Sequence, residues 1–318
     1  MNKRTIISAI GCLLWTACAG NAGNSARAAH QSAGEASPQN PQYVEELPLP
    51  AVPDSLRVPV ERANFVVEHF WDAMEFRDTL RSHSNDFIEQ NFANFISIFP
   101  IADQNSRTLA VGKLMEAAEV DKESYLLLAE VAEKYLYDPN SPMLNEDFYL
   151  EFVDNVLRSK ILDNYEKIRY GYQREAIQKN RPGNRAADFA YRTREGKRTN
   201  LHSTRTQGDL LLIFFDPECE HCKEIISAMA ADPLLEQQIA DGAISVLAVY
   251  SGENEELWKA SAGELPAAWT VGFDTTGIEE RGLYVLRAMP SFYVLDKNKK
   301  VVLKDVPPMQ FAEYLESL

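Results

Sequence analysis

The sequence has few cysteines, four among 318 residues. Cys12 and Cys18 fall in or next to an apolar stretch at the N-terminus, and Cys219 and Cys222 are the other two. Only two residues separate Cys219 from Cys222, and a disulfide that closes so short a loop stabilises a fold little through chain entropy. The spacing therefore argues against a disulfide-stapled scaffold and favours thiol chemistry at this pair.

The sequence also lacks an excess of positive charge and a glycine-rich phosphate loop. Its formal net charge is −15, which argues against nucleic acid and against anionic lipid headgroups as binding partners. Without a phosphate-cradling loop we expect no cofactor. A hydrophobic content of 45% argues against a mostly disordered chain, and 318 residues suit two ordinary domains.

The N-terminal residues have the pattern of an export signal. Lys3 and Arg4 precede an apolar stretch from Ile6 to Leu14, which is too short to span a membrane. The following Thr16-Ala17-Cys18 resembles a bacterial lipobox, in which the cysteine receives lipid after cleavage. We therefore predict a lipoprotein signal peptide over residues 1–18, with the lipid on Cys18.

Other fates of this N-terminal segment stay open. Modification at Cys12, plain secretion and a retained single-pass anchor are the alternatives to a lipid on Cys18. Residues 19–56 are rich in small and polar residues, and up to about Pro53 they have no apolar periodicity. Such a segment cannot bury a core, so we predict a flexible tether.

Residues 57–178 show the apolar spacing of helices. The repeating segments are 63–74, 87–99, 109–120, 121–136 and the run that begins at 145. Asp121 and Asn145 are suited to cap two of these helices, and Pro100 and the Pro139–Pro142 segment interrupt the pattern. Aromatic stripes with helical spacing are usually buried, so we expect a core and not a cofactor box or a peptide groove. The sequence predicts an all-α accessory domain over residues 57–178.

Residues 179–318 show a different pattern, in which short strands alternate with helices. The expected strands are 187–191, 210–215, 243–250, 291–295 and 301–303, and residues 308–318 are expected to form a closing helix. Leu210–Phe215 is a continuous apolar run of the kind found in buried central strands. We predict an α/β domain over residues 179–318, with one hairpin at each end.

Cys219-Glu220-His221-Cys222 follows directly on the expected central strand and precedes an amphipathic segment. This order places Cys219 at a helix N-terminus, where unpaired N–H groups and the helix dipole stabilise a thiolate. Cys222 lies one turn later, where it can resolve a mixed disulfide. We predict that Cys219 and Cys222 are catalytic in thiol–disulfide exchange.

The residues around Cys219 act on its thiolate in opposite directions. His221 supplies positive charge or a hydrogen bond, whereas Glu220 and its acidic neighbours Glu218 and Glu224 supply negative potential. His221 and Glu220 are therefore predicted to tune the pair. The acidic surroundings favour a reducing couple, but the sequence leaves the direction of electron flow undecided.

Residues 182–318 resemble the TlpA-like thioredoxin-domain proteins. The likeness rests on Pro182-Gly183, Ala187-Asp188-Phe189, Phe214-Phe215-Asp216-Pro217, the CxxC motif and Met289-Pro290-Ser291. The resemblance implies an α/β thioredoxin fold that follows the all-α domain in the sequence. It also implies a cis Met289–Pro290 bond, with Met289 and Pro290 seating an extended substrate backbone as an added strand.

This chain departs from the TlpA-like pattern at two positions. Glu218 stands where a tryptophan commonly precedes the first cysteine, and Ile225 stands where some reducing relatives carry a glutamate. The helical block resembles the domain of unknown function that precedes thioredoxin domains in Bacteroidota lipoproteins. That likeness rests on Phe70-Trp71-Asp72 and on a long helix expected from Glu146 to Tyr170. It implies a periplasm-facing, membrane-anchored lipoprotein, with secretion as the alternative.

Three rival interpretations remain open. Cys219, His221 and Cys222 are possible zinc ligands, but the other histidines form no second pair, so we expect no metal. A peroxiredoxin normally has a threonine three residues before its cysteine, and this chain has Asp216 there. The third rival is a lipid-tethered binding protein that uses the thioredoxin domain as a scaffold.

The sequence as a whole predicts a thiol–disulfide oxidoreductase that acts on protein thiols or disulfides in the periplasm. We expect a reductant in preference to an oxidant. A reductant needs electrons, and a membrane electron donor is the expected partner.

Overall fold

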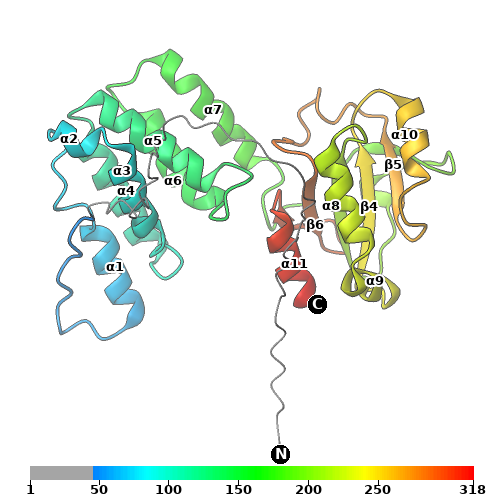
Figure 1. Cartoon of the computed structure of the whole chain (residues 1–318), viewed down its shortest axis with the longest axis horizontal. Coiled ribbons are helices and arrows are strands. Elements are labelled where there is room, and N and C mark those ends of the chain that lie inside the picture. Colours follow the sequence, from blue (N-terminus) through cyan, green and yellow to red (C-terminus); the bar gives the residue numbers. More distant parts are fainter. Residues whose placement is uncertain (1–45) are drawn as a thin grey trace, which may run out of the picture. The chain divides into compact units, whose positions relative to one another are not determined.

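Helices make up the first half of the described chain. The computed structural model describes residues 46–318, and its first helices are blue to green in Figure 1. They are α1 (Pro59–His69), α2 (Thr79–Ser82), α3 (Asn85–Ile96), α4 (Gln104–Ala118), α5 (Lys122–Leu136), α6 (Glu146–Arg158) and α7 (Asn164–Gln178). The predicted helical region is confirmed, and the exact domain boundaries stay predictions.

Side-chain caps fix where these helices begin. Asp121 precedes α5, and its carboxylate accepts a hydrogen bond of 2.8 Å from the Ser124 N–H. Asn145 precedes α6, and its side-chain oxygen accepts a hydrogen bond of 3.0 Å from the Phe148 N–H. Such caps satisfy donors of the first turn that have no partner inside the helix. Both starts agree with the sequence prediction.

The expectation of one long helix from Glu146 to Tyr170 is wrong. Helix α6 ends at Arg158 and α7 begins at Asn164. Asp163 and Glu166 form a capping box, in which each carboxylate accepts a hydrogen bond of 2.9 Å from the other residue's N–H. The apolar spacing continues across the break, but the capping box stabilises a new helix start.

Aromatic side chains of the helices are buried together in one core. Phe87, Phe92, Phe95, Phe99 and Phe152 are each at most 5% exposed. The ring centroids of Phe92 in α3 and Phe152 in α6 lie 5.3 Å apart. Burying a ring of this size stabilises a fold by roughly 1.5–3 kcal/mol. The predicted core role of the aromatic stripes is confirmed.

The second half of the chain is built on a seven-stranded mixed sheet. The strands are β1 (Ala190–Thr193), β2 (Arg198–Asn200), β3 (Asp209–Phe215), β4 (Ile244–Tyr250), β5 (Thr270–Asp274), β6 (Ser291–Leu295) and β7 (Val301–Lys304). Their order across the sheet is β2-β1-β5-β4-β3-β6-β7. Strands β3, β4 and β5 are parallel, and hairpins β1–β2 and β6–β7 are antiparallel.

This topology is the predicted α/β arrangement with a hairpin at each end. Strand β3 lies between β4 and β6, and all but its first residue are buried. Strand β5 was not expected from the sequence, because it has only five residues and Gly272 interrupts its apolar pattern. Gly272 is required there, since a Cβ at this position would lie 2.8 Å from the ring of Tyr191.

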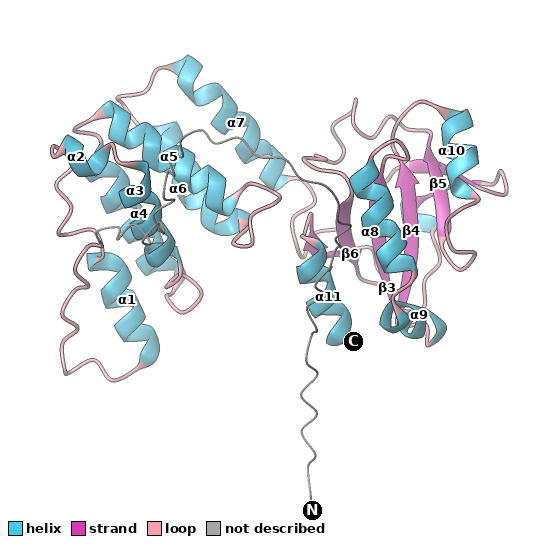
Figure 2. Cartoon of the chain, viewed as in Figure 1, coloured by secondary structure: helices cyan, strands magenta, loops and turns pink. Residues whose placement is uncertain are grey.

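Helices cover one face of the sheet. They are α8 (Glu220–Ala230), α9 (Pro233–Ala240), α10 (Glu255–Ala262) and α11 (Pro308–Glu316). Figure 2 draws them in cyan beside the magenta strands. Their buried residues share a core with alternate residues of β3 and β4, such as Leu211 and Val246. The other face packs against the 3₁₀ turn η1 (Leu201–Ser203) and against Ile278 and Tyr284 of the segment between β5 and β6.

The segment between the helices and the sheet pairs with the edge strand β7. The Gly183 N–H donates to the Val301 carbonyl, and the Val301 N–H donates to the Asn184 carbonyl, each at 2.8 Å. The Ala186 N–H donates to the Lys299 carbonyl, also at 2.8 Å. Residues 183–186, which we call the linker strand, therefore occupy the outer backbone groups of Val301, where β7 begins.

Within residues 46–318, no helix is both long and apolar enough to cross a bilayer. The predicted signal peptide, Cys18 and most of the predicted tether lie outside the described residues.

Candidate functional site

The site forms at the end of the central strand β3, where the chain turns into α8. Cys219 is the N-cap residue of α8, as the sequence predicts. The Asp216 carbonyl accepts a hydrogen bond of 3.2 Å from the Cys219 N–H. The Asp216 carboxylate accepts one of 2.8 Å from the Glu218 N–H. This turn aims the Cys219 sulfur at the first turn of the helix.

Cys219 and Cys222 are both free thiols, and they lie together. The Cys222 N–H donates to the Cys219 Sγ at 3.3 Å. A backbone donor and the positive end of the helix dipole both stabilise negative charge on this sulfur. Cys219 is half-buried and Cys222 is 1% exposed. The pair therefore has one accessible sulfur with a buried sulfur behind it.

The buried thiol is difficult to ionise. Burial raises the pKa of Cys222 to about 12, although a hydrogen bond with the backbone of Asp216 partly opposes that effect. A thiol with such a pKa is a poor nucleophile in free solution. Cys222 thus suits the second step of an exchange, in which its partner sulfur is already adjacent.

Met289 and Pro290 complete the group that the structure brings together. The Met289–Pro290 peptide bond is cis. The Cys219 thiol donates to the Met289 carbonyl oxygen over 3.9 Å. Met289 packs against the cores on both sides of the sheet. The predicted substrate-seating residues therefore lie directly beside the accessible sulfur.

The two predicted tuning residues are arranged differently. Glu220 is exposed and forms an ion pair of 2.6 Å with Lys223, which raises the pKa of that lysine. His221 is exposed, and its ring makes no hydrogen bond or ion pair with the described residues. A tuning role for either residue stays a prediction.

A pocket of about 260 Å³ opens beside Cys222. Its walls come from the turn before α8, from α8 itself and from the last turn of α10 with the segment that follows it. They include Asp216, Lys223, Ile226, Ser261, Glu264 and Pro266. The residues after α10 carry no motif, and nothing in the sequence alone predicts that they lie beside Cys222. Among residues 46–318, no group of three or more His, Cys, Asp or Glu side chains is arranged to hold a metal ion.

Comparison with known proteins places the chain in a family. A family model described as a domain of unknown function, DUF5106, matches residues 17–180, just over half of the chain. The chain belongs to the DUF5106 family. This DUF5106 protein is also 34% identical to a solved thioredoxin-like protein from Bacteroides caccae, with a TM-score of 0.78. That match covers 86% of this chain and 99% of the other.

Two further solved structures match a smaller part of the DUF5106 protein. A conserved protein of unknown function from Bacteroides fragilis is 37% identical over 42% of this chain and 98% of its own, with a TM-score of 0.41. The C-terminal domain of an uncharacterized protein from Bacteroides fragilis is 34% identical over 43% of this chain and 98% of its own, with a TM-score of 0.41. No curated protein matches the chain. The match to the Bacteroides caccae protein confirms the thioredoxin-like fold.

Proposed function

We propose that this protein is a thiol–disulfide oxidoreductase that uses Cys219 and Cys222. The observation that carries the proposal is the arrangement of one half-buried sulfur at a helix N-terminus, one buried sulfur behind it and the Met289 carbonyl beside it. The match to a thioredoxin-like protein from Bacteroides caccae supports it. Each part has a distinct task in disulfide exchange.

Reduction of a substrate proceeds in two displacements. The Cys219 thiolate attacks a substrate disulfide, which forms a mixed disulfide and releases one substrate thiolate that takes up a proton. Cys222 then loses its proton and attacks the Cys219 Sγ, which releases the second substrate thiol. The substrate gains two electrons, and the Cys219–Cys222 pair loses two as it closes its disulfide. The same steps in reverse oxidise a substrate dithiol.

We propose that the protein acts as a reductant on protein disulfides. Burial disfavours the Cys222 thiolate, and Glu218 and Glu220 are exposed around the accessible sulfur. A reduced form that lacks stabilisation gives a more reducing couple, whereas a strong oxidant stabilises its reduced form. A membrane dithiol donor then has to restore the dithiol after each turnover.

The proposed location is the periplasmic side of a membrane, with the chain held by lipid on Cys18. The export-signal pattern and the lipobox-like Thr16-Ala17-Cys18 support this proposal. The tether over residues 19–56 then gives the redox site reach toward protein substrates.

The deciding experiment is a titration of the thiols in a graded dithiothreitol or glutathione buffer, with alkylation to trap each state. We expect a reversible two-electron couple nearer to about −270 mV, as in thioredoxin, than to about −120 mV, as in DsbA. The Cys222→Ser variant is the control, and it should stop at a mixed disulfide. A pair that stays fully reduced or fully oxidised across the series would contradict exchange and favour the tethered binding protein.

A further inference from the structure

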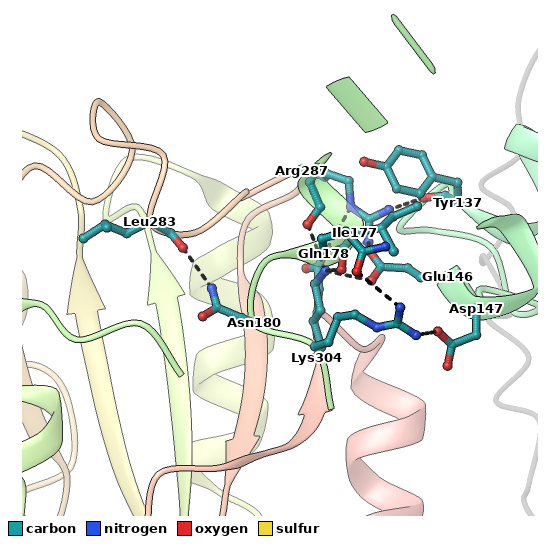
Figure 3. A network of polar contacts seen from close by, with 12 residues as sticks. Tyr137, Glu146, Asp147, Ile177, Gln178, Asn180, Leu283, Arg287 and Lys304 are labelled. Atoms are coloured by element: carbon teal, nitrogen blue, oxygen red, sulfur yellow. Dashed lines mark hydrogen bonds and ion pairs between the residues drawn. The ribbon is translucent and has the colours of Figure 1, made fainter. Parts of the chain in front are cut away.

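Arg287 lies two residues before Met289, in the segment that joins β5 to β6. Figure 3 shows its side chain next to Tyr137 and Glu146, which belong to the helical region. Met289 in turn provides the carbonyl oxygen beside Cys219. The helical region therefore contacts the chain at Arg287, only two residues before the Met289 carbonyl that lies beside Cys219.

The Arg287 guanidinium binds three groups from three parts of the chain. Its Nη1 donates to the Tyr137 carbonyl oxygen at 2.6 Å. Its Nη2 lies 3.1 Å from the Glu146 Oε1 at the start of α6. Nε and Nη2 both donate to the Asp305 Oδ2 after β7, at 2.9 and 2.7 Å. Only a planar group with several fixed donors can make these contacts at once.

The charges in this network are removed from solvent. The side chains of Arg287 and Asp305 are 11% and 4% exposed, and those of Lys304 and Glu146 are 5% and 17% exposed. Lys304 neutralises the second oxygen of Glu146 at 2.8 Å and donates to the Ile177 carbonyl at 3.0 Å. Charges this buried are tolerated only when paired in good geometry. Each charge in the network therefore depends on its partners staying in place.

The same segment is held at a second point. The Asn180 side-chain N–H donates to the Leu283 carbonyl at 2.9 Å, as Figure 3 shows. The Asn180 side-chain oxygen accepts a hydrogen bond of 2.8 Å from the Ala187 N–H. Asn180, just after α7, thus binds Leu283, while Glu146 in α6 and Tyr137 in the connection between α5 and α6 bind Arg287. The backbone that leads to Met289 is fixed from the helical side at both places.

A buried ion-pair network can also act purely as a staple for stability. The position of this network indicates a role in positioning as well as in stability, because Arg287 is on the segment that carries the Met289–Pro290 backbone. The Ser291 hydroxyl donates to the Ala288 carbonyl at 2.6 Å, so little slack remains between the network and Met289. An ion-pair network elsewhere on the sheet would not constrain the Met289–Pro290 backbone.

We propose that Arg287 is a positioning residue through which Glu146 and the Tyr137 carbonyl hold the Met289–Pro290 backbone against Cys219. This inference rests on the proposed exchange function and gives the helical region a part in it. An extended protein substrate needs the Met289 backbone in place, because it pairs there as an added strand. A small disulfide without an extended backbone needs only the reactive sulfur.

The test compares two adjacent carboxylates in the first turn of α6. Glu146 pairs with Arg287 and Lys304, whereas Asp147 is exposed and pairs with Arg181, which is outside the segment before Met289. The substitutions Glu146→Gln and Asp147→Asn each remove one charge from the same turn. Rates are measured on the full chain with a disulfide-bonded extended peptide and with bis(2-hydroxyethyl) disulfide, which has no peptide backbone, after thermal unfolding has shown that each variant is folded.

We expect Glu146→Gln to lower kcat/KM for the peptide disulfide by about 3- to 30-fold, the usual range for a positioning coupling. The rate with bis(2-hydroxyethyl) disulfide should stay at the wild-type value, and Asp147→Asn should match wild type with both disulfides. If Glu146→Gln does not fold, Arg287→Lys replaces it, because lysine keeps the charge but cannot reach all three partners.

Three results overturn the inference while leaving the exchange function intact. The first is an equal loss with both disulfides. The second is an unchanged ratio of the rate with the peptide to the rate with bis(2-hydroxyethyl) disulfide in a folded Glu146→Gln or Arg287→Lys variant. The third is an equal fall of the peptide rate in Asp147→Asn. Failure of the wild-type chain to exchange with either disulfide would instead contradict the proposed function itself.

Discussion

At the scale of single residues, the two cysteines differ in what surrounds their sulfur atoms. The Cys219 Sγ accepts a hydrogen bond from the Cys222 N–H at the start of α8. The Cys222 side chain lies in the core against the sheet, and burial raises its pKa to about 12. Two cysteines three positions apart therefore have different access to reagents in solution.

This difference predicts selective alkylation. At pH 8 a thiol with a pKa near 12 is ionised in a fraction on the order of 10⁻⁴. We expect Cys219→Ser, which retains Cys222, to react with iodoacetamide at least ~100-fold more slowly than Cys222→Ser, which retains Cys219. Mass spectrometry follows the modification. Both variants should react alike in guanidinium chloride, and similar rates in the folded state would contradict the assigned burial.

The residues of the site differ in how far the sequence predicts them. Cys219 and Cys222 are identified by their spacing and by the strand before them, and Met289 and Pro290 by a resemblance to known proteins. The sequence does not single out Arg287, because its partner Tyr137 is 150 positions away. The residues next to an arginine do not predict a contact with a residue so distant in the sequence.

At the scale of secondary-structure elements, the start of α5 is held by an unusually well-satisfied cap. The Asp121 carboxylate accepts hydrogen bonds from the Ser124 N–H and hydroxyl, each at 2.8 Å, and lies 2.7 Å from the His83 Nε2. These contacts, led by the Ser124 N–H, lower the pKa of Asp121 to about 2. The ionised cap thus joins α5 to the residue that follows α2.

Replacing this cap predicts a pH-dependent loss of stability. Asp121→Ala should lower the free energy of unfolding at pH 7 by about 0.5–2 kcal/mol, the usual value of an N-cap. Because the folded pKa is lowered, the stabilisation is complete above the unfolded pKa of about 3.9 and is lost as pH falls toward 2. Urea unfolding at pH 7 and pH 2.5 measures both values.

Asp86 offers a matched control for the cap. It is an exposed first-turn residue of α3, and Ser84 caps that helix instead. Asp86→Ala should therefore change the unfolding free energy by much less than Asp121→Ala at pH 7. A difference between wild type and Asp121→Ala that persists undiminished at pH 2.5 would show that the carboxylate charge is not the cause.

The elements that the sequence predicts well are those with long or strongly marked patterns. The central strand β3 is a continuous apolar run, and α5 and α6 begin at residues with capping side chains. The division between α6 and α7 was not predicted, since apolar periodicity continues through a break that one capping box creates. Strand β5 was missed because tertiary pairing with β1 and β4, and not local preference, makes its five residues a strand.

At the scale of the whole molecule, the proposed lipid anchor and the redox site are separate parts of the chain. Cys18→Ala should therefore move the protein from the membrane fraction to the soluble periplasmic fraction and abolish its labelling by a fatty-acid precursor. Its thiol titration should match that of wild type, because Cys219 and Cys222 are about 200 positions away and the predicted tether intervenes. Membrane association that survives the substitution would indicate the retained single-pass anchor, and a soluble wild-type protein would indicate plain secretion.

The linker strand beside β7 has a consequence for how the chain avoids self-association. An uncovered edge strand offers free N–H and C=O groups to any other extended chain, and sheets can join in this way. Residues 183–186 precede Val301 in the sequence, so a chain synthesised from its N-terminus forms the cover before the residue that it covers. At this end of β7, neither the N–H nor the C=O of Val301 is left to pair with another molecule.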